Sequence, residues 1–235
     1  MIDREYIIKE IINHTGINGD ININNSVASR IEHTLLNPEA TKEDIKILCD
    51  EAKFYGFFGV CVQPYWVKFA HTLLRNTNVK LVAVCGFPDG VHRPEVKTQE
   101  ARLAVLDGAD EVDMVMNIGA FKSKDYDNVV QDIKMVKNAI RPLIKLKVII
   151  ETPLLSEEEI VKAALLVEES GANFVKTGTG RNGPVKVRDV ELIKKAVKIP
   201  IKAAGGIREK ELALQLIRAG AERIGTSSGP KVAGE

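Results

Sequence analysis

Two lysines and an aspartate are the residues of this sequence best suited to perform chemistry together. Lys176 ends a short apolar run and is followed at once by a glycine-rich turn, Lys202 ends another apolar run, and Asp113 lies in a third. If these runs are strands of one parallel sheet, their carboxyl ends open onto the crevice where such sheets hold ligands. A partly desolvated ammonium loses its proton more readily, and the neutral amine is a nucleophile.

The pairing of the lysines sharpens this expectation. Two ammonium groups close together disfavour each other's charge, which lowers the pKa of at least one of them, while a nearby carboxylate can hold the other charged and pass protons. The sequence therefore predicts catalytic roles for Lys176, Lys202 and Asp113. The alternatives are a lysine that extends from a strand end to water and a structural ion pair at the rim of the sheet.

Glycine-rich segments after two consecutive apolar runs predict a phosphate site. Ala204-Gly205-Gly206 follows the run that ends at Lys202, and residues 225–229 read Gly-Thr-Ser-Ser-Gly. Backbone N–H groups in such turns bind phosphate, although tight loops also use glycine for conformational reasons alone. Beside the lysine pair, the two segments together predict a phosphate-binding group made of Gly180, Gly205, Gly206, Arg208, Ser227 and Ser228.

Composition and spacing argue against several other classes of protein. The net charge of +1 is not that of a nucleic-acid binder, and neither a signal peptide nor a membrane span is visible, so we expect a cytoplasmic protein. The three cysteines and four histidines lack metal-ligand spacing. Asp107, Asp110 and Asp113 form an acidic stretch that could suggest a cation site. Asp107 and Asp110 are expected at the opposite end of the fold from Asp113, so one metal ion could not reach all three, and we expect no metal. We also expect no cofactor. His33 is expected to be packed or hydrogen-bonded rather than a general base.

Apolar runs alternate with helical patterns along the whole chain. Strands are expected at residues 28–34, 57–62, 79–85, 111–116, 146–150, 173–176, 199–202 and 223–225. Helices are expected at residues 3–13, 41–55, 94–106, 124–140, 156–169, 187–197 and 209–218, with a further one from residue 64 and a truncated one after the last strand. The glycines at 56, 108, 171 and 220 each follow a helical pattern and precede a strand, where a left-handed helix end favours glycine.

Eight such units predict an α/β fold, a (β/α)8 TIM barrel that forms a single domain over residues 1–235. The structural alternative is a doubly wound open sheet, whose usual glycine fingerprint is missing from the first strand-helix turn. All strand ends of a barrel converge on one face. We therefore expect Thr34, Cys61 and Asn117, which lie at or close behind strand ends, to join the substrate site.

Several segments, in this order, resemble the deoxyribose-phosphate aldolase family. They begin at Ile31-Glu-His-Thr-Leu-Leu and continue through Gly59-Val-Cys-Val-Gln-Pro, Gly86-Phe-Pro-Asp-Gly, Lys97-x-x-Glu-Ala, Glu111-Val-Asp-Met-Val-Met-Asn-Ile-Gly-Ala, Lys147-Val-Ile-Ile-Glu-Thr, Phe174-Val-Lys-Thr-Gly-Thr-Gly, Lys202-Ala-Ala-Gly-Gly-Ile-Arg and Arg223-Ile-Gly-Thr-Ser-Ser-Gly. The resemblance covers almost the whole chain, and the joint order of the segments is very specific.

The resemblance implies a class I aldolase on a TIM barrel that cleaves 2-deoxy-D-ribose 5-phosphate to acetaldehyde and D-glyceraldehyde 3-phosphate, reversibly. It implies that Lys176 forms the Schiff base, that Lys202 is the second lysine that favours the neutral form of the first, and that Asp113 relays protons with Lys202. It also implies a homo-oligomer, a dimer or a tetramer.

Three departures from the family pattern concern efficiency and substrate rather than the type of chemistry. Glu32 stands where the family usually has aspartate, Gly178 stands where it has serine and is expected to loosen the turn after Lys176, and the sequence ends soon after the last glycine segment. Two rival functions stay open: a Schiff-base aldolase for another phosphorylated sugar, and a silent sugar-phosphate-binding protein.

Overall fold

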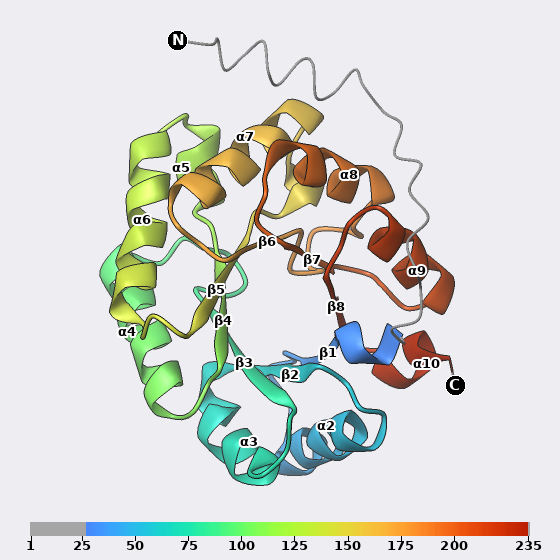
Figure 1. Ribbon diagram of the computed structural model, residues 1–235. Coiled ribbons are helices and arrows are strands. Elements are labelled where there is room, and N and C mark those ends of the chain that lie inside the picture. The colour runs from blue at the N-terminus through green and yellow to red at the C-terminus, as the bar shows by residue number, and fades with distance from the viewer. Residues whose placement is uncertain (1–26, 235) are drawn as a thin grey trace.

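Eight parallel strands close into a barrel in the computed structural model, which describes residues 27–234 (Figure 1). Each strand pairs with the next along the chain, and β8 pairs with β1. The strands are β1 (Ile31–Leu35), β2 (Gly59–Val62), β3 (Lys80–Cys85), β4 (Glu111–Val115), β5 (Lys145–Ile149), β6 (Phe174–Lys176), β7 (Ile201–Ala204) and β8 (Arg223–Thr226). The predicted (β/α)8 barrel is confirmed, and the open sheet is excluded.

The helices form a ring outside the strands (Figure 1). They are α2 (Lys42–Phe54), α3 (Val67–Leu74), α4 (Pro94–Leu106), α5 (Ile118–Lys122), α6 (Tyr126–Ala139), α7 (Glu157–Glu169), α8 (Val187–Ala196), α9 (Lys210–Arg218) and α10 (Gly229–Ala233), with short 3-10 turns η1 (Val27–Arg30), η2 (Pro64–Trp66) and η3 (Thr152–Leu154). The helix expected at residues 3–13 lies outside the described residues.

Local sequence signals explain where several helices begin and end. Thr41 with Asp44, and Ser156 with Glu159, form capping boxes in which side chain and backbone satisfy each other's hydrogen bonds. The glycines that follow α2, α4, α7 and α9, at positions 56, 108, 171 and 220, all have φ between 66° and 116°. They take the left-handed conformation that glycine adopts at low cost, as predicted.

Two expected elements differ from the observed ones. The strand expected at 28–34 begins with the turn η1, and only its second half pairs in the barrel. The helix expected at 124–140 is preceded by a separate helix, α5, which the sequence reading missed. The side chain of Asn117 accepts a hydrogen bond from the N–H of Ala120 (3.0 Å) and caps α5.

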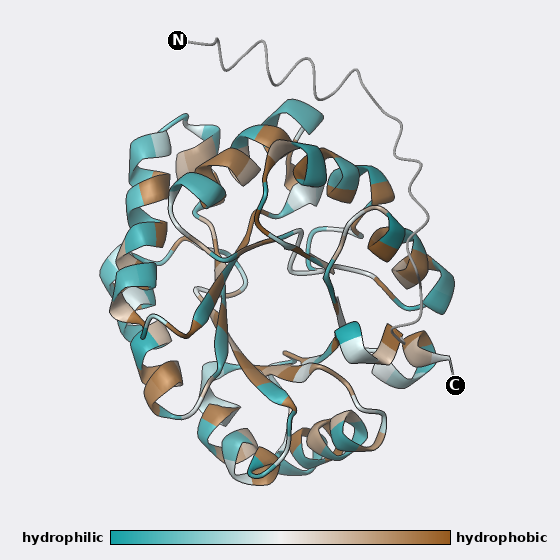
Figure 2. Cartoon of the chain, viewed as in Figure 1, coloured by the Kyte–Doolittle hydropathy of each residue, from teal (hydrophilic) through white to brown (hydrophobic). Residues whose placement is uncertain are grey.

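Most of the hydrophobic core lies between the strands and the helices, while polar residues gather on the outer faces of the helices (Figure 2). A second, smaller apolar cluster consists of Leu36, Cys61, Val82 and Val84, with Phe87 packed against it. Its strand members come from β2 and β3. The charged residues described below come instead from β1 and from β4 to β7, so the apolar and charged groups occupy different strands of the barrel.

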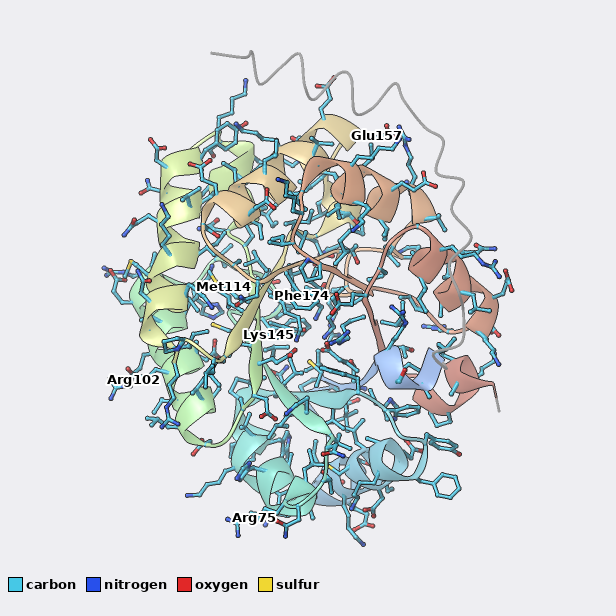
Figure 3. The ribbon with its side chains drawn as sticks, in the orientation of Figure 1. Arg75, Arg102, Met114, Lys145, Glu157 and Phe174 are labelled. Atoms are coloured by element: carbon cyan, nitrogen blue, oxygen red, sulfur yellow. The ribbon has the colours of Figure 1, made fainter. Side chains whose placement is uncertain are left out.

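The end of the barrel opposite the strand carboxyl ends is covered by aromatic and basic side chains. Phe174, the first residue of β6, is buried, and the Nζ of Lys145 lies 5.6 Å from the centre of its ring (Figure 3). The guanidinium of Arg223 lies 3.8 Å from the ring centre of Phe58. These contacts lie at the amino ends of β6 and β8, away from Lys176 at the carboxyl end of β6.

Candidate active site

The strand register places the predicted catalytic residues beside one another. Lys176 of β6 pairs with Lys202 of β7, and Asp113 of β4 pairs with Lys147 of β5. Partners in register on parallel strands point to the same face. Three of these side chains are completely buried, and Lys176 is 3% exposed.

One carboxylate joins all three lysines. Oδ2 of Asp113 accepts hydrogen bonds from Nζ of Lys176 (2.7 Å) and from Nζ of Lys202 (2.6 Å). Its Oδ1 accepts from Nζ of Lys147 (3.0 Å). Because one oxygen touches both Lys176 and Lys202, a proton can pass between the two amines through a single atom.

Two glutamates complete this charge cluster. Glu32 contacts Nζ of Lys202 and lies 3.4 Å from Nζ of Lys147, and Glu111 lies 2.5 Å from the same Lys147 nitrogen. The longer arm of Glu32, at the position where the family has aspartate, thus reaches two lysines. The cluster comprises the lysines 147, 176 and 202 and the carboxylates Glu32, Glu111 and Asp113, which balance in charge.

Lys147 and Glu111 belong to the segments that resemble the aldolase family, but the sequence predicted no part in the site for either residue. The position of Lys147 in the sequence does indicate such a role. Lys147 lies in the middle of an apolar strand, and a charged residue that is buried there needs a partner of opposite charge inside the barrel.

Carboxylates, more than lysine repulsion, govern the electrostatics of this cluster. Burial alone would raise the pKa of Asp113, but the ammonium groups of Lys147, Lys176 and Lys202 outweigh burial and hold that pKa well below its ordinary value. Burial alone would lower the pKa of Lys202, but Asp113 and Glu32 outweigh burial and raise it. The raised pKa of Lys202 agrees with the expectation that a nearby carboxylate holds one lysine of the pair charged.

A cavity of about 340 Å³ opens above the cluster at the carboxyl ends of the strands. Among the cluster residues, Lys176 is the one that lines it. The other lining residues are Thr34, Leu36, Asn37, Phe87, Gly178, Thr179, Gly180, Arg181, Ala204, Gly205, Gly206, Ile207, Arg208, Gly225, Thr226 and Ser227. A ligand in this cavity meets one amine and many backbone and hydroxyl groups.

Most of the predicted site residues come together around this cavity. Thr34, Gly180, Gly205, Gly206, Arg208 and Ser227 line it, and Lys202 and Asp113 lie directly behind Lys176. Arg181, an exposed arginine next to Gly180, also lines the cavity and was not predicted from the sequence.

Three predicted binding residues lie outside the cavity lining. Asn117 caps α5, and the N–H of Ser228 donates to Oγ1 of Thr226 (2.9 Å). Cys61 is buried with its Sγ 4.0 Å from Oδ2 of Asp113. Burial raises the pKa of the Cys61 thiol.

His33 faces a neighbouring cavity rather than the lysines. This cavity, of about 450 Å³, is lined by residues of β1, α2 and the segment after β8, and none of its lining residues is a lysine. Nε2 of His33 lies 2.6 Å from the carboxylate of Glu51. His33 is thus hydrogen-bonded to α2, in keeping with its predicted structural role.

The turn after Lys176 is held by a buried glutamate. Glu151 follows β5 in a left-handed conformation (φ 57°), and its carboxylate accepts from the N–H of Thr179 (3.2 and 3.3 Å) and from the Thr179 hydroxyl (2.6 Å). A Cβ on Gly178 would lie 3.0 Å from Oε1 of Glu151. Because Gly178 has no side chain, it leaves room for the Glu151 carboxylate. The hydrogen bonds from Thr179 to Glu151 hold the turn after Lys176, although glycine in place of serine was expected to loosen it.

We expect Thr179→Val to lower the free energy of unfolding by about 1–3 kcal/mol, because it leaves a buried carboxylate with one partner fewer. Denaturant unfolding measures the change. Thr179→Ser keeps the hydroxyl and serves as the matched control, so an equal loss in both variants would contradict a role for the hydroxyl bond.

The described part of the chain shows neither a metal-binding cluster nor a membrane-spanning helix. Within residues 27–234, no cluster of three or more histidine, cysteine or acidic side chains has an arrangement that could hold a metal ion. Over the same residues, no helix has both the length and the hydropathy needed to cross a membrane.

Comparison with known proteins identifies close relatives. A family model described as DeoC/LacD family aldolase matches residues 16–232. Deoxyribose-phosphate aldolase of Thermococcus kodakarensis is 56% identical over 212 residues, which are 88% of this chain and 95% of that protein. The Enterococcus faecalis protein of the same name is 51% identical over 202 residues, 85% of this chain and 92% of its own length. Among solved structures, a tetrameric deoxyribose phosphate aldolase from Aeropyrum pernix superposes with a TM-score of 0.80 at 32% identity, covering 98% of this chain and 97% of its own.

Proposed function

The chain belongs to the DeoC/LacD aldolase family, and we propose that it cleaves 2-deoxy-D-ribose 5-phosphate reversibly to acetaldehyde and D-glyceraldehyde 3-phosphate through a Schiff base on Lys176. The assignment of Lys176 as the nucleophile rests on its position relative to the cavity and to Lys202. Lys176 lines the cavity, while its Nζ shares Oδ2 of Asp113 with the fully buried Lys202. Substrate can thus reach one amine, and the other is placed to exchange protons with it.

In the proposed reaction, the ammonium of Lys176 first gives up a proton through Asp113. The neutral amine attacks the C1 aldehyde of the open-chain sugar. The proton that Lys176 gave up returns when the resulting hydroxyl leaves as water, and a protonated Schiff base remains. The C2–C3 bond then breaks as the C3 hydroxyl gives its proton to a solvent water, and the bonding electrons move into an enamine on Lys176 while D-glyceraldehyde 3-phosphate leaves. Protonation of the enamine at C2 and addition of water release acetaldehyde and the free lysine.

Asp113 and Lys202 are proposed to manage the protons of these steps. Asp113 holds a proton only in passing, because its low pKa restores the carboxylate after each transfer, and the carboxylate keeps Lys176 and Lys202 in contact. Lys202, whose pKa is raised, serves as a charged donor next to Lys176. Formation of the Schiff base needs a neutral amine on Lys176, and this form is favoured when Lys202 keeps its own proton and charge.

The rim of the cavity is proposed to bind the substrate phosphate. Gly180, Gly205, Gly206 and Ser227 offer backbone and hydroxyl donors there, and the side chains of Arg181 and Arg208 are exposed beside them. Arginine is suited to phosphate because its guanidinium presents several donors at once.

Borohydride trapping tests the nucleophile. Acetaldehyde with borohydride is expected to add an ethyl group to Lys176, because reduction of the Schiff base makes it permanent; peptide mass spectrometry locates it. An unmodified Lys176 peptide from an enzyme that turns over substrate would overturn the assignment. Turnover measured on a panel of phosphorylated sugars separates the proposed substrate from that of another aldolase, and a silent binding protein would turn over none of them.

The same proposal includes a cytoplasmic location and a homo-oligomer, a dimer or a tetramer. The tetrameric description of the Aeropyrum pernix relative supports the oligomer. Light scattering on the purified protein measures the mass of the assembly.

A further inference from the structure

Two threonine hydroxyls hold the glycine loop after β7 from both sides. Oγ1 of Thr177, at the end of β6, donates to the carbonyl of Ala204 (2.8 Å) and accepts from the N–H of the same residue (2.9 Å). Oγ1 of Thr226, the last residue of β8, donates to the carbonyl of Ile207 (2.6 Å). Gly205 and Gly206 therefore lie between two residues that are each tied to a neighbouring strand.

Thr226 also ties down the other phosphate-binding segment. The same Oγ1 accepts from the N–H of Ser228 (2.9 Å), so one hydroxyl joins the loop after β7 to the loop after β8. Thr226 is 4% exposed, and its two partners are backbone groups. A hydroxyl has a single proton to donate. That proton is committed to Ile207, so the hydroxyl has none left for a ligand.

The glycines between these ties take conformations that depend on them. Gly205 (φ 115°) and Gly206 (φ 69°) are both left-handed, and a Cβ on Gly206 would lie 2.9 Å from Cβ of Pro184. A loop with two glycines has many accessible conformations when it is free. Fixing both of its ends reduces the conformational entropy that the loop loses when it closes on an anion.

We propose that Thr226 is a positioning residue that joins the two phosphate-binding loops and thereby sets the preference of this enzyme for a phosphorylated over an unphosphorylated sugar. The inference rests on the proposed function, because it assumes that the rim of the cavity binds the substrate phosphate. Thr226 acts through the Gly205–Gly206 and Ser227–Ser228 segments rather than by touching the substrate.

Thr226→Val tests this proposal, because valine keeps the shape of threonine and removes the hydroxyl. We expect KM for deoxyribose 5-phosphate to rise about tenfold with kcat nearly unchanged, since a lost ground-state contact appears in KM. The Kd of inorganic phosphate, measured by calorimetry on the free enzyme, is expected to rise by a similar factor. The kcat/KM for unphosphorylated 2-deoxyribose is expected to stay at the wild-type value.

Two matched variants separate positioning from general damage. Thr226→Ser retains the hydroxyl and should restore both KM and phosphate binding. Thr72→Val removes a comparable hydroxyl bond, from Thr72 to the Phe69 carbonyl (2.7 Å), on the exposed side of α3 and should leave every constant unchanged.

The inference would be overturned by an unchanged KM and an unchanged phosphate Kd in Thr226→Val, or by equal losses for the phosphorylated and unphosphorylated sugars. Failure of the proposed function gives a different result, namely a wild-type enzyme that does not turn over deoxyribose 5-phosphate. In that case the phosphate Kd still reports on Thr226 directly.

Discussion

Replacing Lys176 with methionine is expected to reduce turnover of deoxyribose 5-phosphate by at least about 10⁴-fold, the scale seen when a covalent nucleophile is removed. Methionine has nearly the length of lysine and no amine, so no Schiff base can form. The variant is also expected to show no ethyl adduct after treatment with acetaldehyde and borohydride. Initial rates and intact-protein mass spectrometry provide the two measurements.

The remaining charged residues of the cluster are expected to keep the Lys176→Met variant folded, so that a loss of activity reports on the missing amine. In Lys176→Met, Asp113 still has Lys202 and Lys147 as partners, so the barrel interior keeps its remaining ion pairs. We therefore expect the variant to fold and to bind inorganic phosphate like the wild type. A folded Lys176→Met enzyme with more than a small fraction of wild-type activity would show that another residue is the nucleophile.

Asp113→Asn is expected to have the second largest effect, on activity and stability together. The change leaves three buried lysines around a neutral amide, and removing one partner of a buried ion pair costs about 3–5 kcal/mol. Turnover should fall by about 10³-fold or more, because the bridge between Lys176 and Lys202 is lost. Activity assays and denaturant unfolding at neutral pH measure both effects.

The pH dependence of stability distinguishes the charge of Asp113 from its shape. Because its native pKa lies well below the ordinary value of about 3.9, its stabilising contribution is present above that value and is lost as pH falls toward the native pKa. The difference in unfolding free energy between wild type and Asp113→Asn should therefore shrink in acid. A difference that does not change with pH would argue against the ionic role.

Asp132→Asn is the matched control for the loss of a buried ion pair. Asp132 is 3% exposed and lies 2.7 Å from Nζ of Lys97, outside the candidate active site. Its replacement should destabilise the protein without preventing turnover by the folded fraction. If both variants lost activity in proportion to stability alone, the special role of Asp113 would be contradicted.

The sequence was sufficient to predict the barrel and the residues at the ends of its strands. Lys176, Lys202 and Asp113 were recognisable because a charged residue at the end of, or inside, an apolar strand must be accommodated at the carboxyl face or in the barrel. The glycine-rich segments identified the rim of the cavity for a similar local reason. The resemblance to a known family then implied which reaction these residues perform and which role each of them has.

What the sequence did not reveal depends on contacts between distant segments. The role of Glu151 requires that the end of β5 face the turn after β6, and the role of Thr226 requires that two loops meet. The electrostatics of Lys202 depend on Glu32, which is 170 positions away. Asn117 was expected in the substrate site because it lies close behind a strand end, and its side chain caps α5, a helix that the sequence did not predict.

The equal numbers of lysines and carboxylates in the barrel interior have a consequence for the catalytic cycle. A protonated Schiff base on Lys176 carries the same single positive charge as the ammonium that it replaces. Counted as three ammonium and three carboxylate groups, the interior is electrically neutral both at rest and in the protonated Schiff base. Placing net charge in a medium of low dielectric constant is expensive, so this neutrality lets the enzyme pass between free and covalent states without rebuilding its surroundings.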